Sequence, residues 1–461
     1  MTESNRPSLR QVGVSISKLT AGETVNKLTR FAATVLLART LSLSEFGIVN
    51  VGIAISGILL TLTSLGLPEY GAREVAVSPR NVKQIGGLVV YTRLGALSLA
   101  SVIALLGTAI LAPSQLSLVT LAIVMTLGLA GSADWLLRGR EQMGDVATAT
   151  SLGGIVVLVG CATIVLLLPT TAAALIVFAV GEASAGFYTW RRAKVGHLRR
   201  PAFKEAWKLV KSTWPLGASG IIIYASYANL DSILLAALRS DTEAGLYSAP
   251  YRLFLAANSV IIFAAYALLP MLARSHHEGR PKEKRNLLLR AFRPLAAYGL
   301  VILGAAELLG GPFIETVFGA DFAGTESAFI LLCMSTPLYA IGYPAGYSLI
   351  GEQRNWRFFV GGAIAGTLNL VLMILLIPNQ GIDGAAIATT AGLVGGGIAW
   401  LVLSDSLRPT KVLFGILTLF SLLAILAAQS TAFAIPIGFV TTAAGLSLGL
   451  PQLLRTLRRT G

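Results

Sequence analysis

Long apolar segments recur along the whole 461-residue chain and constrain its fold more than any other feature. Each approaches or exceeds the roughly 20 residues that a helix needs to cross a bilayer. Hydrophobic residues make up 54% of the chain and charged residues 13%, whereas about a quarter of a soluble domain is charged. The sequence therefore predicts an all-α polytopic membrane protein. The net charge of +14 is better explained by basic loops beside an anionic leaflet than by nucleic-acid binding.

The apolar segments predict fourteen transmembrane helices. The first lies within Lys18–Gly47, and nothing before Gln11 resembles a cleavable signal, so we expect this helix to be retained. The others are expected at about 46–66, 84–112, 114–135, 146–168, 170–190, 212–238, 244–272, 287–310, 325–349, 355–378, 382–404, 411–429 and 431–453.

Basic residues gather in alternate loops. The even-numbered loops hold the clusters 190–211 and 274–290, whereas the odd-numbered loops hold only Arg39 and Arg239. The positive-inside rule then places the basic loops in the cytoplasm. We predict a multi-pass protein of the plasma or inner membrane with both termini cytoplasmic.

Two motifs recur in the two halves of the chain. LLARTLSLSEFG (Leu36–Gly47) aligns with LLAALRSDTEAG (Leu234–Gly245), and the residues around Glu141 align with those around Glu352. Chance similarity between apolar segments is the alternative, but matching charges and glycines favour a repeat of six helices. The predicted organisation is a six-helix lobe at 1–190, a basic cytoplasmic linker at 191–211, a second six-helix lobe at 212–404, and two additional helices with a basic tail at 405–461.

The opening segment carries Glu23, Lys27 and Arg30 within one narrow arc of a helix. Glu23 and Lys27 are four residues apart and can neutralise each other, which leaves Arg30 unpaired on that face. Charged residues inside a membrane usually face a bundle interior or a wet cavity. We favour a charged cavity wall over an internal ion pair.

Three more basic residues inside predicted helices are Arg93, Arg252 and Arg293. All three could snorkel to a helix end, and Arg252 could instead pair with Asp231. A cluster of cations suits a phosphate-bearing substrate, because guanidinium groups offer paired donors to phosphate oxygens. The predicted substrate-binding residues are Lys27, Arg30, Arg93, Arg252 and Arg293.

Acidic residues inside the spans are candidates for ion coupling. Asp231 lies deep in the predicted helix 212–238 and is either an ion-pair partner or a titrating group. Glu23 is the second candidate. We expect no cofactor, although a coupling proton or sodium ion fits a carboxylate of this kind.

The motifs of nucleotide-hydrolysing enzymes and zinc proteases do not occur in the sequence. It contains no P-loop and no H-E-x-x-H pattern. Cys161 and Cys333 lie inside apolar segments, without the spacing of metal ligands or a disulfide framework. We therefore expect a protein that is not an enzyme, with no catalytic or metal-binding residues.

The segment Leu36–Gly47 resembles the LAR-x-L-x-x-x-EFG signature of polysaccharide-repeat flippases, members of the multidrug/oligosaccharidyl-lipid/polysaccharide (MOP) exporter superfamily. The similarity extends along essentially the whole chain. Further matches are Asn229–Asp231, EAGLYSAPYR (Glu243–Arg252), FGADF (Phe318–Phe322) and GEQ (Gly351–Gln353).

The resemblance implies a V-shaped, two-lobed transporter that moves an undecaprenyl- or dolichyl-linked oligosaccharide from the inner to the outer leaflet. It also implies proton or sodium antiport and a role in polysaccharide biosynthesis, with glycan-assembly enzymes as partners. Similarity to the peptidoglycan-precursor flippases is weaker, because only Lys27 and Arg30 fill the role of their arginine-rich first helices. Two alternatives are an organic-cation antiporter of the same superfamily and a non-transporting scaffold for glycosyltransferases.

Overall fold

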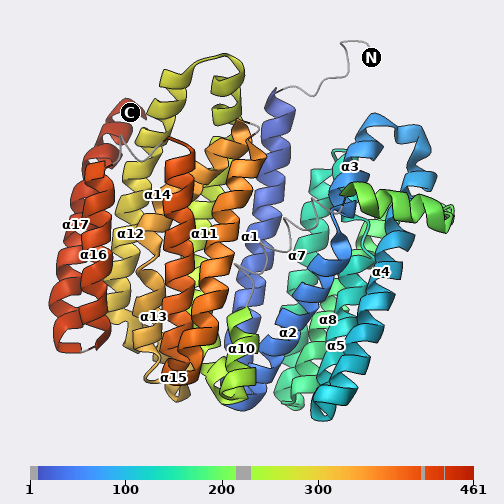
Figure 1. Ribbon diagram of the computed structural model, residues 1–461, viewed down its shortest axis with the longest axis horizontal. Helices are drawn as coiled ribbons and strands as arrows, with labels where there is room; N and C mark the ends of the chain where they lie inside the picture. Colours follow the sequence, from blue (N-terminus) through green and yellow to red (C-terminus); the bar gives the residue numbers. More distant parts are fainter. Residues whose placement is uncertain (1–8, 214–229, 353, 406–410, 430, 461) are drawn as a thin grey trace. The chain divides into compact units, whose positions relative to one another are not determined.

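The computed structural model describes residues 9–213, 230–352, 354–405, 411–429 and 431–460 (Figure 1). These residues form helices and contain no strand, which confirms the predicted all-α class. The chain divides into two compact units, Met1–Tyr224 and Ala225–Gly461. Among the described residues, nine helical segments are long and apolar enough to cross a membrane. The count of fourteen stays a prediction.

Three of the five spans by which fourteen exceeds nine have identifiable causes, and a fourth, 212–238, lies mostly outside the described residues. Helix α15 (Asn355–Leu403) runs through two predicted spans and is interrupted at Gly381, where φ is +53°. Only glycine adopts such a conformation readily, so this residue marks the predicted boundary near residue 380. Helices α16 (Lys411–Gln429) and α17 (Thr431–Thr460) contain only shorter apolar stretches.

Unit 1 is a bundle in which the first helix packs along the fifth predicted span. Helix α1 (Leu9–Thr40) makes its most extensive contacts with α7 (Met143–Gly160). The remaining helices are α2 (Leu43–Ser64), α3 (Leu67–Val77), α4 (Val82–Leu111), α5 (Leu116–Ala130), α6 (Asp134–Gly139) and α8 (Thr171–Ala193), with a π-helical turn at Cys161–Val165.

A separate short helix, α3, follows the second predicted span, 46–66, where the apolar pattern has already ended. Leu65 and Gly66 adopt left-handed conformations between α2 and α3, and Pro68 lies in the first turn of α3, where proline is well tolerated. The chain therefore bends at the end of α2 and extends to Val77 before α4 begins.

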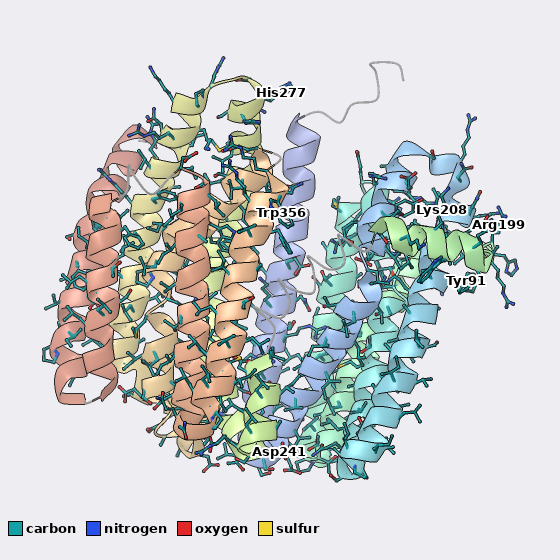
Figure 2. The ribbon with its side chains drawn as sticks, in the orientation of Figure 1. Tyr91, Arg199, Lys208, Asp241, His277 and Trp356 are labelled. Atoms are coloured by element: carbon teal, nitrogen blue, oxygen red, sulfur yellow. The ribbon has the colours of Figure 1, made fainter. Side chains whose placement is uncertain are left out.

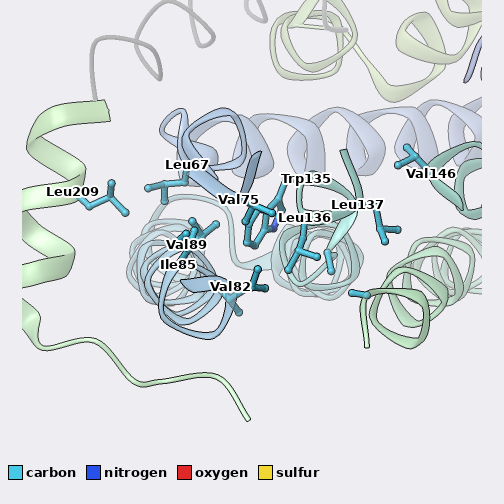
Figure 3. Packing of buried hydrophobic residues seen from close by; sticks show 13 residues of the cluster. Leu67, Val75, Val82, Ile85, Val89, Trp135, Leu136, Leu137, Val146 and Leu209 are labelled. Carbon is cyan, nitrogen blue, oxygen red and sulfur yellow. The ribbon is translucent and has the colours of Figure 1, made fainter. Parts of the chain in front are cut away.

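A hydrophobic cluster joins α3, α4 and α6 at one end of unit 1 (Figure 3). Trp135 of α6 is 1% exposed and contacts Gly71 of α3 so closely that a Cβ atom there would lie 2.5 Å from its ring. A further helix, residues 203–213, places Leu209 in this cluster. Its Lys208 lies at the same end of the unit as Tyr91 (Figure 2).

Unit 2 contains the long helices of the second half. Helix α12 (Pro281–Phe318) packs along α17, and α14 (Thr336–Gly351) packs against both α15 and α11 (Asp241–His277). The shorter helices are α10 (Leu230–Leu238) and α13 (Glu326–Cys333). The core of this unit is built from buried side chains that include Leu288, Phe292 and Leu300 of α12.

The two aligned motifs form the same helix cap. The side chain of Ser42 accepts a hydrogen bond from the N–H of Glu45 at 3.3 Å, and that of Ser240 accepts one from Glu243 at 3.1 Å. Glu45 completes a capping box by accepting from the N–H of Ser42. Glu243 instead pairs with Arg239 at 2.9 Å. The predicted correspondence of the two motifs is confirmed at this turn.

Candidate functional site

Close packing between α1 and α7 fixes the charged segment of the first helix. A Cβ atom on Gly22 would lie 2.6 Å from Ala147, and one on Gly154 would lie 2.3 Å from the hydroxyl of Thr29. Glycine at these two positions lets the helix backbones approach each other, as in other membrane helix pairs. This close packing fixes the positions of Asn26 and Arg30 relative to α7.

Arg30 is held by two helices. Its Nη2 donates to Glu182 Oε1 of α8 at 2.5 Å, and its Nε donates to Asn26 Oδ1 at 2.9 Å. The guanidinium also lies 5.9 Å from the centre of the Phe178 ring. The expectation that Arg30 has no partner was therefore wrong, because α8 supplies a carboxylate that helix spacing within α1 cannot reveal.

The Arg30–Glu182 pair is accessible on the arginine side. The side chain of Arg30 is 28% exposed and that of Glu182 is 10% exposed. The guanidinium carries more donors than this pair and Asn26 use. The geometry therefore combines a fixed cation with donors that remain available to an anionic group.

Glu23 and Lys27 occupy the turns of α1 before Arg30. Lys27 is exposed, Glu23 is half-buried, and the two charges interact electrostatically. This arrangement agrees with mutual neutralisation at a spacing of four residues. The structure brings Glu23, Lys27 and Arg30 onto one stretch of α1, as the sequence predicts, and adds Glu182 to it.

Arg93 is placed apart from this group. It is 3% exposed within α4, and its Nε has no hydrogen-bond partner among the described residues. A side chain as buried as this one does not snorkel to the helix end. Asp134 and Glu69 are the acidic residues that interact with it electrostatically. A buried cation with an unused donor is costly, which is compatible with a functional role.

In unit 2, Asp231 is 1% exposed in α10. Its Oδ1 accepts from the N–H of Ser232 at 3.0 Å, while its Oδ2 has no hydrogen-bond partner among the described residues. Arg252 of α11 is half-buried and interacts with this carboxylate electrostatically. The predicted neighbourhood of Asp231 and Arg252 is therefore present, without a direct ion pair between them in the described contacts.

Arg293 does not join these residues. It lies exposed on α12, and its position agrees with a solvated or snorkelling side chain. Glu307 of α12 is a second buried acid of unit 2 that the sequence analysis did not choose as a coupling residue. It is 1% exposed, and its two carboxylate oxygens have no hydrogen-bond partners among the described residues. Its place inside the predicted span 287–310 was the available signal, as it was for Glu182 in span 170–190.

The tyrosines of α14 pack against aromatic residues of α15. Tyr343 lies between Tyr339 and Tyr347, with ring centres 4.9 and 4.8 Å away, and contacts Trp400 at 5.9 Å. Tyr339 and Tyr347 are buried. These rings therefore stabilise the α14–α15 contact.

Together, the long apolar helices and the charges inserted among them define a multi-pass membrane protein. A family model described as "Polysaccharide biosynthesis protein" matches residues 12–276. The chain belongs to this family, which confirms the predicted resemblance.

A curated relative from Haloferax volcanii, the "Probable low-salt glycan biosynthesis flippase Agl15", is 22% identical over 206 residues. The match covers 43% of this chain and 42% of the relative. The chain thus aligns with less than half the length of that curated protein.

Solved structures share the fold. "Lipid II flippase MurJ" in an inward closed conformation aligns with a TM-score of 0.69 at 15% identity, covering 95% of this chain and 99% of that one. An inward-facing multidrug resistance MATE family transporter of the MOP superfamily aligns with a TM-score of 0.67 at 13% identity, covering 87% and 98%. At these identities the likeness shows the fold alone.

Proposed function

We propose that this protein is a flippase that moves a polyprenyl-phosphate- or pyrophosphate-linked oligosaccharide from the inner to the outer leaflet for polysaccharide biosynthesis or export. The observation that carries the proposal is the anchored, partly exposed guanidinium of Arg30 on α1. Family membership and the names of the flippase relatives support the same function.

The chemistry of the substrate explains the need for such a cation. A phosphate or pyrophosphate group loses its hydration when it leaves water, and a charge-assisted hydrogen bond compensates for part of that loss. Arg30 is preorganised by Glu182 and Asn26, so little side-chain freedom is lost when it binds an anion. Lys27, three residues before it on an exposed face, supplies a further hydrogen-bond donor, although Glu23 offsets its charge.

Ion coupling is the second part of the proposal, with Asp231 as the coupling group. A buried carboxylate that alternates between a dry environment and a nearby cation gains and loses affinity for a proton or sodium ion. The burial of Asp231 and its electrostatic interaction with Arg252 support this assignment. The same proposal places both termini and the basic segments 190–211 and 274–290 in the cytoplasm.

The test is transport by the purified full chain in liposomes. A fluorescent oligosaccharide on a short polyprenyl pyrophosphate is incorporated, and exposure of the sugar to an external lectin is followed over time. We expect wild type to transfer the lipid and Arg30→Ala to transfer it about tenfold more slowly, since a hydrogen bond to a charged group contributes affinity of this order. Arg30→Lys should recover part of the rate.

Two other results would contradict the proposal, and each would favour a different function. Export of an organic cation without glycan transfer would assign the chain to drug antiport. Absence of any transport, together with binding of a glycosyltransferase in detergent, would assign it a scaffold role. In cells, depletion of a flippase should leave lipid-linked glycan on the cytoplasmic leaflet.

A further inference from the structure

A cationic cavity lies at the end of unit 2 where α11 gives way to α12 and α14 gives way to α15. Its volume is about 450 Å³, within the range of roughly 300–1,000 Å³ typical of small-molecule sites. Figure 2 labels His277, the last residue of α11, at this end of the unit. The charged residues that line it are Arg280, Lys284, Arg285, Arg354, Glu352 and Asp405.

Glu352 organises the cations of this cavity. Its side chain is 4% exposed and forms ion pairs with Lys284 of α12 and with Arg354, the latter at 3.1 Å. One carboxylate is thus shared between two cations. Arg285 makes no ion pair with any described residue, whereas Arg280 pairs with Glu278 at 3.3 Å and Glu283 at 3.4 Å.

The position of these cations is not explained by helix stability. Lys284 and Arg285 lie in the first turns of α12, where the helix dipole is positive and favours anions over cations. An anion bound between the start of α12 and these side chains would interact favourably with both. Basic loops beside an anionic leaflet account for exposed residues such as Lys282 and Arg290, but not for Lys284 and Arg354, which converge on a nearly buried carboxylate.

The cavity also has an apolar wall. Leu288 and Phe292 line it and are 2% and 1% exposed, and both belong to the core of unit 2. A fixed turn holds Arg280 above them, because its N–H donates to Ser275 O at 2.9 Å after Gly279 adopts a φ of +65°. The site therefore pairs a rigid apolar wall with a cationic rim.

The repeat does not impose these cations. The turn around Glu141, which the sequence aligns with the turn around Glu352, also borders a cavity, but its charged lining residues are Glu141 and Asp145. No lysine or arginine lines that cavity of unit 1. Between these two aligned turns, the cationic lining is thus specific to the second half.

We propose that the cavity of unit 2 binds the phosphate group of an anion, with Arg280, Arg285 and Lys284 as its ligands and Glu352 as a built-in competitor. The phosphate can come from the headgroup of an anionic membrane lipid or from a soluble phosphate compound. The apolar wall favours a lipid, since Leu289, which also lines the cavity and is half-buried, offers a surface for the glycerol and the first acyl carbons. This site is separate from Arg30 and does not depend on whether the chain transports a glycan.

The experiment measures binding to the purified full chain in a neutral detergent. Phosphatidylglycerol and inorganic pyrophosphate are titrated separately, and the rise in melting temperature gives an apparent affinity for each. A response to phosphatidylglycerol alone identifies a lipid site, and a response to pyrophosphate identifies a site that also accepts soluble phosphate. No response to either would overturn the proposal.

Variants test the assigned residues. Arg280→Gln and Arg285→Gln should each weaken binding about tenfold, since each removes a charge-assisted hydrogen bond. Lys282→Gln is the matched control: it lies on the same turn of α12, is exposed and does not line the cavity. An equal loss in Lys282→Gln would show nonspecific attraction and overturn the site.

Glu352→Gln gives the sharpest result. Loss of this carboxylate releases Lys284 and Arg354, so phosphate affinity should increase even if the unliganded protein melts at a lower temperature. A purely structural role for the Lys284–Glu352–Arg354 group predicts the lower melting temperature without a gain in affinity. Weaker binding in Glu352→Gln would also contradict the proposal.

Discussion

Arg30 of α1 and Glu182 of α8 form an ion pair of 2.5 Å although they are 152 residues apart in sequence. The pair gives the charged face of the first helix a fixed orientation within unit 1. Because of this pair, removal of Arg30 combines two effects, the loss of a substrate contact and the loss of a structural partner for Glu182.

A double substitution distinguishes these effects. Arg30→Ala should destabilise unit 1 by about 1–3 kcal/mol, because the nearly buried carboxylate of Glu182 loses its charged partner. Arg30→Met combined with Glu182→Gln should recover most of that stability, since no unpaired charge remains. Melting temperature measures this recovery. Glycan transfer should stay about tenfold below wild type in the double variant; full recovery of transfer would show that Arg30 acts only through the ion pair.

Asp231→Asn should retain transport down a substrate gradient and lose the acceleration caused by an imposed proton or sodium gradient. The reason is that an amide of similar shape cannot exchange a proton or offer a negative charge to sodium. Reconstituted transport with each gradient applied separately is the measurement. Glu307→Gln is the control, because Glu307 is another buried acid of unit 2, and it should keep the gradient response. If Asp231→Asn responds fully and Glu307→Gln does not, the two assignments are exchanged.

Gly154→Ala should destabilise the α1–α7 contact by about 1–3 kcal/mol through overpacking. The added Cβ would lie 2.3 Å from Thr29 Oγ1 and 2.8 Å from Asn26 Oδ1, so it displaces the residue that holds Arg30. The melting temperature and the rate of glycan transfer should both decrease. Gly107→Ala in α4 meets no atom within 4 Å and should leave the protein equally or more stable. Equal effects of the two substitutions would contradict the close packing.

Ser42→Ala and Ser240→Ala should each lower the free energy of unfolding by about 1 kcal/mol, because each removes the cap of a long helix. Ser98→Ala provides the comparison, since the Ser98 hydroxyl only bonds back to Leu94 O within α4. Its effect should stay within about 0.5 kcal/mol. A loss at Ser42 but not at Ser240 would mean that the matching geometry of the caps does not carry matching stability.

Cysteine labelling tests the orientation. Cysteines at Ser114, Thr242 and Ala323, which are exposed, should react with an impermeant thiol reagent from outside the cell. Those at His197 and His276 should react only after the membrane is opened. The natural cysteines, Cys161 and Cys333, are 1% and 0% exposed and should give little background. Reversed labelling in either half would contradict the positive-inside assignment.

The sequence was sufficient for features that depend on neighbouring residues. Hydropathy predicts the helical class and most helix limits, and the serine and glutamate of each aligned motif predict the corresponding caps. The turn at Thr170 is also local, because Thr170 caps α8 through the N–H of Ala173 at 3.2 Å.

Contacts between distant segments could not be predicted in this way. No spacing within α1 indicates that Glu182 supplies the partner of Arg30, since that choice depends on how α1, α7 and α8 pack. Helix α3 was missed for a related reason: its residues are polar on one side and interrupt the apolar pattern. The cationic cavity likewise combines residues from three separate turns of unit 2.

The caps at Ser42 and Ser240 also bear on how the chain is made. Each cap is complete within four consecutive residues, so the turn into the next helix can form as soon as those residues leave the ribosome. A connection fixed this early presents two adjoining helices to the membrane as a hairpin, before the helices that later cover them have been synthesised. Because the same cap recurs in the second half, each half can begin its insertion independently of the other.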